Sequence, residues 1–251
     1  MSNKGQTVLI TGAGRGIGMA IAVKLANEGY DLILNYRRDQ GKSAANLQRF
    51  VEQETRVKVT LAKADIAEPR DIQEMVKKLQ KYGITRIDHL VLNAAAAPFK
   101  PFMEMTRSDW KLLLNTNLIG NTACVQEVVP LMTSGGTICA ISSLGSQIVL
   151  PKYPLGIAKS ALENLVRYLE VELYDRSIRV NGICAGVVNT DMSLFLKDLW
   201  PDMFTRYNNG TRRWMVEPEE VANITSFLLS EQSSAIRGTT LIADLGTTLE
   251  L

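Results

Sequence analysis

A glycine-rich run near the N-terminus has the residue types and spacing of an anion-binding turn. Residues 11–18 are TGAGRGIG, and they lie directly between a short apolar run and a helical pattern. Glycine permits a tight turn and a close approach of the backbone to a pyrophosphate, while the N–H groups that open a helix attract the anion. This run therefore predicts a dinucleotide site formed by Gly12, Arg15, Gly16, Ile17 and Gly18.

The end of the next apolar run indicates which dinucleotide is bound. Sites that prefer NAD place a carboxylate near the end of the second strand, where it bonds the ribose 2′-hydroxyl. Here residues 35–38 are NYRR, and no carboxylate follows until Asp39. Guanidinium groups pair well with phosphate, so Arg37 and Arg38, together with Arg15, predict NADP(H) as the cofactor. The alternative is that these arginines form an ordinary solvated surface.

The elements that must position this turn are short apolar runs, rich in β-branched residues, which alternate with longer helical patterns. After the first run, Ile17, Ile21 and Leu25 follow the helical period. The alternation predicts an α/β fold, a single doubly wound Rossmann-type domain over 1–251 with a seven-stranded parallel sheet. The expected strands are 7–11, 31–36, 57–65, 89–95, 136–143, 178–186 and 239–246.

Composition excludes several other classes. A chain of 251 residues, 46% of them hydrophobic, suits one continuous core. The net charge of +2 is spread along the chain, so we expect no nucleic-acid partner. The three cysteines lack the spacing of a disulfide or metal site, so no metal is expected. Without a signal-peptide pattern or a long apolar run, we expect no membrane partner and a cytoplasmic location.

One irregular stretch, residues 192–215, mixes aromatic residues with Asn-Asn-Gly and basic residues. It follows the sixth expected strand, on the side where the carboxyl ends of strands meet a ligand. We predict a mobile substrate lid there. The alternative is a short helical excursion that stays packed.

Several separated motifs, in this order, resemble the short-chain dehydrogenase/reductase family over nearly the whole chain. They are TGAGRGIG (11–18), Asp65-Ile66, LNAA (92–95), Asn117, ISSLG (141–145), AGVVNT (185–190) and DLG (244–246). The resemblance implies cofactor contacts from Asp65, Ile66, Asn93, Ala94, Ala95, Lys159, Val188 and Thr190. It also implies catalytic roles for Lys159, Ser142 and Asn117, with Asn117 at a helix bulge near Lys159. The second donor is either Ser142 or Ser143, and the simpler alternative for such a serine at a strand end is a turn residue. For Thr190 the simpler alternative is a helix cap.

The chain departs from this family at its tyrosine. The family places a tyrosine four residues before the lysine, but that position holds Leu155, which has no proton to give. The nearest phenol is Tyr153, six residues before Lys159 and followed by Pro154, which suits the first turn of a helix. This displaced tyrosine resembles the NADPH-dependent enoyl-acyl-carrier-protein reductases of the family, although five residues rather than six separate it from the lysine.

The displacement suggests a particular acceptor. When hydride adds to the β-carbon of a conjugated enoyl thioester, charge develops on the thioester oxygen, so the proton donor must stand farther out than in a ketone reductase. We therefore predict that Tyr153 is the donor and that Lys159 holds the ribose and lowers the pKa of the phenol. Two alternatives remain: a reductase of another carbonyl or conjugated substrate, and a catalytically silent NADP(H)-binding protein.

The resemblance also implies partners and context. It suggests a homotetramer in which helices around 105–130 and 155–175 pack across two-fold axes. The expected substrate is a small molecule or an acyl thioester, carried by coenzyme A or by an acyl carrier protein. Such chemistry belongs to lipid metabolism, for example fatty acid biosynthesis.

Overall fold

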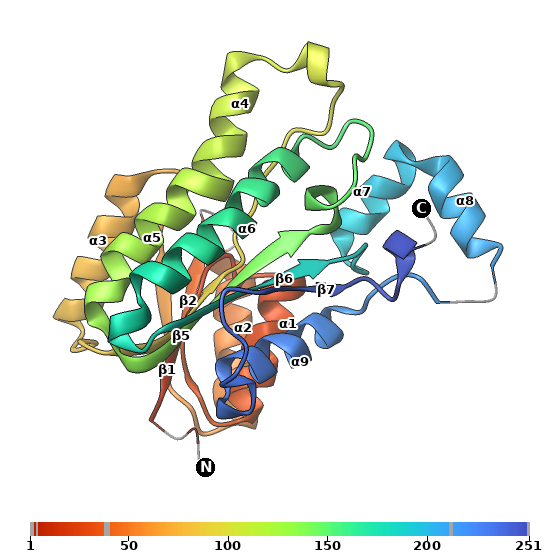
Figure 1. The fold of residues 1–251 in the computed structure, drawn as a ribbon. Helices are drawn as coiled ribbons and strands as arrows, with labels where there is room; N and C mark the ends of the chain where they lie inside the picture. The colour runs from red at the N-terminus through yellow and green to blue at the C-terminus, as the bar shows by residue number, and fades with distance from the viewer. Residues whose placement is uncertain (1–2, 4, 38–40, 211–212, 250–251) are drawn as a thin grey trace.

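Parallel strands cross the centre of the molecule in the order β3-β2-β1-β4-β5-β6-β7 (Figure 1). The computed structural model describes residues 3, 5–37, 41–210 and 213–249. The predicted seven-stranded parallel sheet is confirmed, with every ladder in parallel register. The strands are β1 (Thr7–Ile10), β2 (Asp31–Tyr36), β3 (Val59–Lys63), β4 (Ile87–Leu92), β5 (Met132–Ser143), β6 (Arg179–Ala185) and β7 (Thr240–Ala243).

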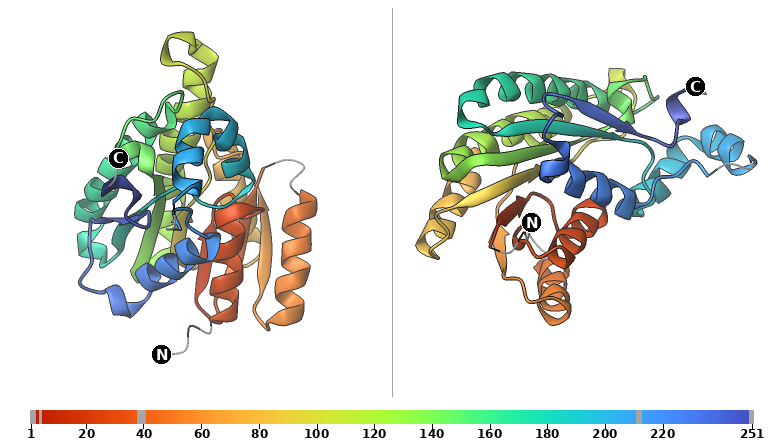
Figure 2. Two further views of the ribbon diagram at one scale, coloured as in Figure 1. Left: turned by 90° about the vertical axis from the view of Figure 1, so that its right-hand side faces the viewer. Right: turned by 60° about the horizontal axis from the view of Figure 1, so that its bottom comes forward.

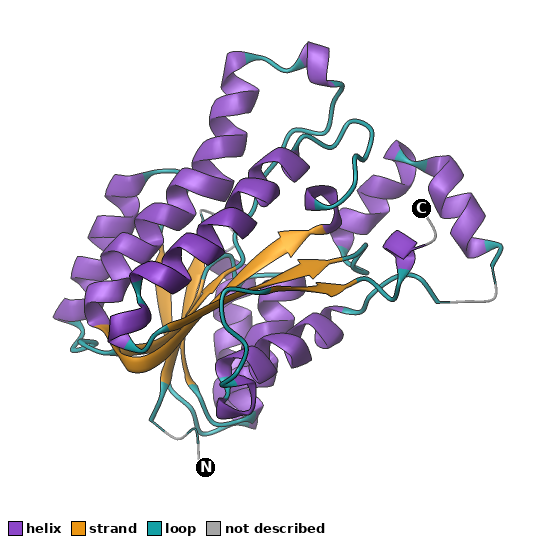
Figure 3. Ribbon diagram, in the orientation of Figure 1, coloured by secondary structure: helices purple, strands orange, loops and turns teal. Residues whose placement is uncertain are grey.

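Helices cover both faces of this sheet, which gives three layers (Figure 3). One face carries α1 (Gly16–Asn27), α2 (Gly41–Glu54) and α9 (Pro218–Leu229). The other carries α3 (Pro69–Lys81), α5 (Gly120–Val128) and α6 (Leu155–Glu172), with α4 (Arg107–Leu114) leading into α5. The two further views in Figure 2 show the same layers from the side and from below. Strands that are covered on both faces need continuous apolar runs, which is what the sequence supplies.

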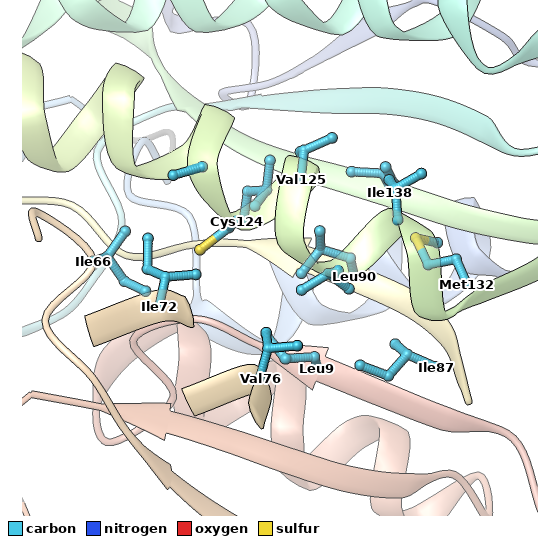
Figure 4. Close-up of a cluster of buried hydrophobic side chains, with 14 of the residues drawn as sticks. Leu9, Ile66, Ile72, Val76, Ile87, Leu90, Cys124, Val125, Met132 and Ile138 are labelled. Carbon is cyan, nitrogen blue, oxygen red and sulfur yellow. The ribbon is translucent and has the colours of Figure 1, made fainter. Parts of the chain in front are cut away.

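The core is divided by the sheet into two main clusters. One lies between the sheet and α3, α5 and α6, where Leu9, Leu90 and Ile138 from the strands meet Ile72 and Val125 from the helices (Figure 4). The other lies between the sheet and α1, α2 and α9. Burial of one such aliphatic side chain contributes about 1.5–3 kcal/mol, so these layers hold the strand ends rigidly.

The strand order reverses at β1, which lies between β2 and β4. In open parallel sheets, ligands bind in the crevice beyond the carboxyl ends of the strands at such a reversal. The residues that follow β1, β2 and β4 therefore meet at one edge. The fifth and sixth strands end beside them, in register from Thr137 opposite Arg179 to Ser143 opposite Ala185.

Beyond β6, the expected lid forms two helices, α7 (Asp191–Leu199) and α8 (Pro201–Asn208). They share an apolar cluster with the segment that follows them, in which Trp200, Phe204 and Trp214 are buried. The Phe204 and Trp214 rings meet edge to face at 4.8 Å. The aromatic residues that made this stretch irregular in sequence are thus the ones that pack it as helices. Its motion stays a prediction.

The three cysteines, Cys124, Cys139 and Cys184, are buried and unpaired. Within the described ranges, no three His, Cys, Asp or Glu side chains gather as a metal site would require. Among the same residues, none of the helices combines the length and apolarity needed to cross a bilayer.

Candidate active site

The glycine-rich turn between β1 and α1 is closed so tightly that side chains are excluded. Gly12 has φ of +64° and Gly16 has φ of +52°, a left-handed backbone that favours glycine. A Cβ on Gly12 would lie 3.0 Å from the Cα of Ala94. A Cβ on Gly18 would overlap the Gly12 carbonyl and lie 2.6 Å from Asn93 Nδ2. The backbone N–H groups that open α1 thus face the crevice without intervening side chains.

Two asparagines lock this turn in place. Asn93 donates from Nδ2 to the carbonyls of Thr11 and Gly12, at 2.9 and 3.1 Å. Asn35 accepts the Gly12 N–H at 3.2 Å and donates to the carbonyls of Ala62 and Ala64. The sequence predicted Asn93 from its motif but missed Asn35. A buried amide at a strand end, where an apolar residue would otherwise stand, is the signal that could have found it.

A cavity of about 480 Å³ extends from this turn along the strand ends. Of the predicted cofactor residues, its walls include Gly12, Arg15, Gly16, Ile17, Gly18, Arg37, Asp65, Ile66, Asn93, Ala94, Ala95 and Thr190. Arg38 lies outside the described residues. The volume of this cavity, the glycine residues along its wall, and Arg15 and Arg37 fit a dinucleotide that carries an additional phosphate.

Arg37 lies at the far end of this cavity, in a loose contact with Asp65. The guanidinium is 3.7 Å from the carboxylate, and half of the arginine side chain is exposed. Exposed pairs of this kind are weak and screened by salt. The guanidinium can therefore turn to a phosphate at little cost.

Tyr153 stands in the loop before α6, as the sequence predicts, and its hydroxyl is 3.0 Å from the hydroxyl of Ser143. The partly buried ring stacks on Phe99 at 5.5 Å and meets the edge of Trp200 at 5.3 Å. Burial raises the pKa of Tyr153, although the hydrogen bond with Ser143 opposes this. The phenol is therefore protonated at neutral pH and suits a proton donor. Ser143 is one of the two serines that the sequence offered as a second donor.

Lys159 is buried on α6 and donates from Nζ to the Ile141 carbonyl at 2.6 Å. Burial lowers the pKa of this lysine to about 8, and the Glu163 carboxylate opposes the shift. Burial is the largest influence on the pKa of the Tyr153 phenol and raises it, and the opposing influence comes from Ser143. The expected lowering of this pKa by Lys159 stays a prediction. Leu155, at the family's tyrosine position, lies in an apolar cluster with Leu113 and Ala158.

Ser142 is placed differently from the expectation for a second donor. Its hydroxyl donates to Glu163 at 2.5 Å and is buried with that carboxylate. Successive side chains of a strand point to opposite faces, so Ser142 and Ser143 cannot both face the phenol. It is Ser143 that bonds Tyr153.

Asn117 lies in a π-helical turn, Asn115–Ile119, between α4 and α5. This is the helix bulge that the resemblance implied. Its Nδ2 donates to the carbonyls of Ala96 and Leu113 at 2.6 and 2.8 Å. These bonds join the bulge to the loop after β4, so Asn117 supports the wall of the cavity.

Thr190 stands at the start of α7, and its predicted contact with the cofactor stays a prediction. It is the N-cap of α7, where its backbone N–H bonds the Ser193 hydroxyl at 3.3 Å, and it also lines the cofactor cavity. Val188 lies just before it, paired in a short bridge with Val216.

A second cavity, of about 170 Å³ and called the inner cavity below, adjoins the first and is lined by the catalytic candidates except Asn117. Ser142, Ser143, Tyr153, Lys159 and Val188 contribute to its walls. Leu196 and Trp200 close it from the side of α7. The indole of Trp200 donates to the Pro151 carbonyl at 2.7 Å, which ties α7 to the loop that carries Tyr153.

Comparison with known proteins agrees with this geometry. A family model described as "Enoyl-(Acyl carrier protein) reductase" matches residues 12–248. The chain is 32% identical to 1-cyclohexenylcarbonyl-CoA reductase of Streptomyces collinus over 98% of this chain and 88% of the relative. It is 30% identical to a 3-oxoacyl-acyl-carrier-protein reductase of Staphylococcus epidermidis over 94% of this chain and 96% of the relative. The chain belongs to the short-chain dehydrogenase/reductase family.

Solved structures have the same fold. One from Burkholderia cenocepacia, in complex with NADP, superimposes with a TM-score of 0.89 at 26% identity, covering 99% of this chain and all 100% of the other. A blue fluorescent protein from a metagenomic library, in complex with NADPH, gives 0.84 at 25% identity, covering 98% of this chain and 99% of the other. This chain is accordingly an oxidoreductase, and the predicted cofactor matches the ligands in both structures.

Proposed function

We propose that this protein is an NADPH-dependent reductase that reduces the conjugated C=C bond of an enoyl thioester. The observation that carries the proposal is the position of Tyr153. Its hydroxyl lies on the wall of the inner cavity beside Ser143, whereas the usual tyrosine position is filled by the buried, apolar Leu155. The family description and the relative from Streptomyces collinus, named for a conjugated acyl-CoA, support this acceptor.

Each residue of the inner cavity has a separate role in this reaction. When bound, the reduced nicotinamide supplies hydride to the β-carbon of the acceptor. Tyr153, protonated because burial raises its pKa, donates its proton to the thioester oxygen, where negative charge develops. The enol so formed becomes the saturated thioester by gaining a proton from water at the α-carbon and returning the proton on oxygen to the phenolate. Ser143 holds the phenol through the bond between the two hydroxyls. Lys159 has a charged amine at neutral pH, and its N–H donors beyond the bond to Ile141 suit ribose hydroxyls.

The decisive test is turnover of crotonyl and longer enoyl thioesters with NADPH by the wild type and by Tyr153→Phe. We expect the variant to lose at least about 100-fold in kcat, as for removal of a general acid, with NADPH affinity within about threefold. A matched control is Tyr82→Phe, since that tyrosine is exposed at the end of α3 and lines neither cavity. Undiminished turnover by the Tyr153 variant would remove the phenol from the mechanism.

A ketone acceptor is the second candidate, favoured by the 3-oxoacyl reductase relative at similar identity. Acetoacetyl and crotonyl thioesters presented with NADPH separate the two. Faster reduction of the keto thioester would replace the enoyl proposal. Normal NADPH binding without oxidation against either would support the silent NADP(H)-binding alternative.

We also propose a homotetramer that acts on a thioester of coenzyme A or of an acyl carrier protein. Large apolar side chains are exposed on the outer sides of the helices expected at the two-fold axes: Leu112 on α4, Ile119 before α5, and Tyr168 and Val171 on α6. Exposed apolar patches of this kind favour association. Sedimentation velocity of the full chain measures the assembly, and a monomer would contradict the proposal.

A further inference from the structure

We infer that Glu163 is a positioning residue that ties the end of β5 and the turn after it to α6, and so fixes Tyr153 and Lys159 relative to each other. The inference rests on the proposed function, in which Tyr153 is the proton donor. No motif considered in the sequence pointed to this carboxylate.

Three donors converge on the Glu163 side chain, and all come from one short segment. Ser142 donates to Oε1 at 2.5 Å, Ser146 donates to the same oxygen, and Gln147 donates from Nε2 to Oε2 at 2.8 Å. The glutamate is 8% exposed. A buried carboxylate costs free energy unless its oxygens accept hydrogen bonds, and here residues 142–147 supply them. The segment is thereby held against the helix.

The segment tied in this way shapes the place of the phenol. Gly145 lies in it, and a Cβ there would approach the Tyr153 ring carbons to 2.8 Å. Gly156, in the first turn of α6, lies against the Gly145 backbone, where a Cβ would overlap the carbonyl oxygen. Ser143 lies in the same segment and bonds the Tyr153 hydroxyl. A shift of this segment would therefore move both the ring packing and the partner of the donor.

Glu163 also acts on the lysine. It follows Lys159 by four residues, so the two side chains leave the same face of α6 one turn apart. The negative charge keeps the buried amine protonated to higher pH than burial alone would allow. The other titratable groups around the cluster are Tyr153, Cys184 and Asp244. Burial raises the pKa of Cys184 to about 11, so it is neutral, while hydrogen bonds outweigh burial and lower the pKa of Asp244.

The same helix offers a matched control. Glu170 lies two turns farther along α6 and is also 8% exposed. Its carboxylate accepts from the Val180 N–H at 2.7 Å and from Arg237 Nε at 2.5 Å, away from the inner cavity. Replacing Glu170 therefore measures the effect of losing a buried carboxylate on the stability of the fold, without disturbing Tyr153 and Lys159.

The experiment compares Glu163→Gln, Glu163→Asp and Glu170→Gln with the wild type. In the ligand-free protein, NMR titration of lysine labelled with ¹³C at Cε, assigned with Lys159→Met, measures the Lys159 midpoint. We expect Glu163→Gln to lower that midpoint by about half a pH unit or more, and Glu163→Asp to leave it near that of the wild type. Glu170→Gln should leave it unchanged. NADPH affinity against pH, followed by fluorescence, should show the same order.

Turnover provides the second readout. We expect Glu163→Gln to lower kcat for a crotonyl thioester at least about threefold, because the new amide N–H meets the Gln147 donor, with Glu170→Gln at the wild-type rate. An unchanged Lys159 midpoint in Glu163→Gln, or equal effects of the Glu163 and Glu170 variants, would overturn the inference. If the wild type turns over no thioester, the proposed function fails, whereas the titration still decides the role of Glu163.

Discussion

At the residue scale, Arg37 is the side chain that we expect to select the cofactor. Its guanidinium is half exposed, loosely paired with Asp65, and placed at the end of the cavity where the second strand finishes. An NAD-type site would hold a carboxylate there to bond the ribose hydroxyl. A cation at this place favours an additional phosphate instead.

We predict that Arg37→Ser weakens NADPH binding by about ten- to 100-fold, because a hydrogen bond to a charged group is worth about 1.5–3 kcal/mol. NADH affinity should hardly change. Fluorescence titration with both cofactors measures the effect, and Arg49→Ser, an exposed arginine on α2, serves as the control. Equal weakening of both cofactors would show that Arg37 binds a part that the two share.

At the scale of an element, the turn between β1 and α1 depends on the absence of a side chain at Gly18. A Cβ there would overlap the backbone of Gly12 and crowd the Asn93 amide that locks the turn. These neighbours are backbone atoms or are held by hydrogen bonds, so they cannot move aside without a loss of stability.

We predict that Gly18→Ala lowers NADPH affinity by at least about tenfold, since the N–H groups that open α1 would shift. The control is Gly83→Ala. Gly83 has φ of +82° and nothing within 4 Å of a new Cβ. That change should cost about 1 kcal/mol of stability through backbone strain and leave NADPH binding intact. Thermal unfolding and fluorescence titration distinguish the two, and equal loss of affinity would contradict the prediction.

The elements themselves were predictable because their signals are local. The apolar runs form the strands, of which β4 and β6 are buried throughout, and the glycine motif opens α1 at Gly16. The displaced Tyr153 and the bulge at Asn117 also lie where sequence placed them. Sequence could not choose between Ser142 and Ser143, because that choice depends on strand orientation relative to α6. Nor could it find Glu163 or Asn35, whose partners lie up to 21 and 40 residues away.

On the scale of the whole molecule, we expect His89 to make stability depend on pH. It is buried in β4, with Nδ1 2.7 Å from the Thr137 hydroxyl and its ring edge-on to Tyr30 at 5.5 Å. Burial lowers the pKa of His89 to about 4 from its usual 6.5, although Asp88 opposes the shift. The folded state thus binds this proton at a lower pH than the unfolded state does.

Because the unfolded state binds more protons in this window, we predict that stability falls as the pH is lowered from about 6.5 to about 4. The total loss from His89 should be about 3 kcal/mol. Urea unfolding at several pH values measures it, and His89→Asn should flatten the slope across this window. Parallel slopes for the two proteins would assign the acid sensitivity to other groups.

The bond between the Trp200 indole and the Pro151 carbonyl has a consequence for how the protein handles its reductant. If α7 swings outward to admit an acyl group, the loop two residues before the phenol loses its anchor at the same moment. Tyr153 would then be positioned to donate its proton only when α7 is closed over the cavity. Other acceptors that enter the open cavity would meet no positioned proton donor. NADPH would therefore be oxidised only by a substrate that stays bound until α7 closes.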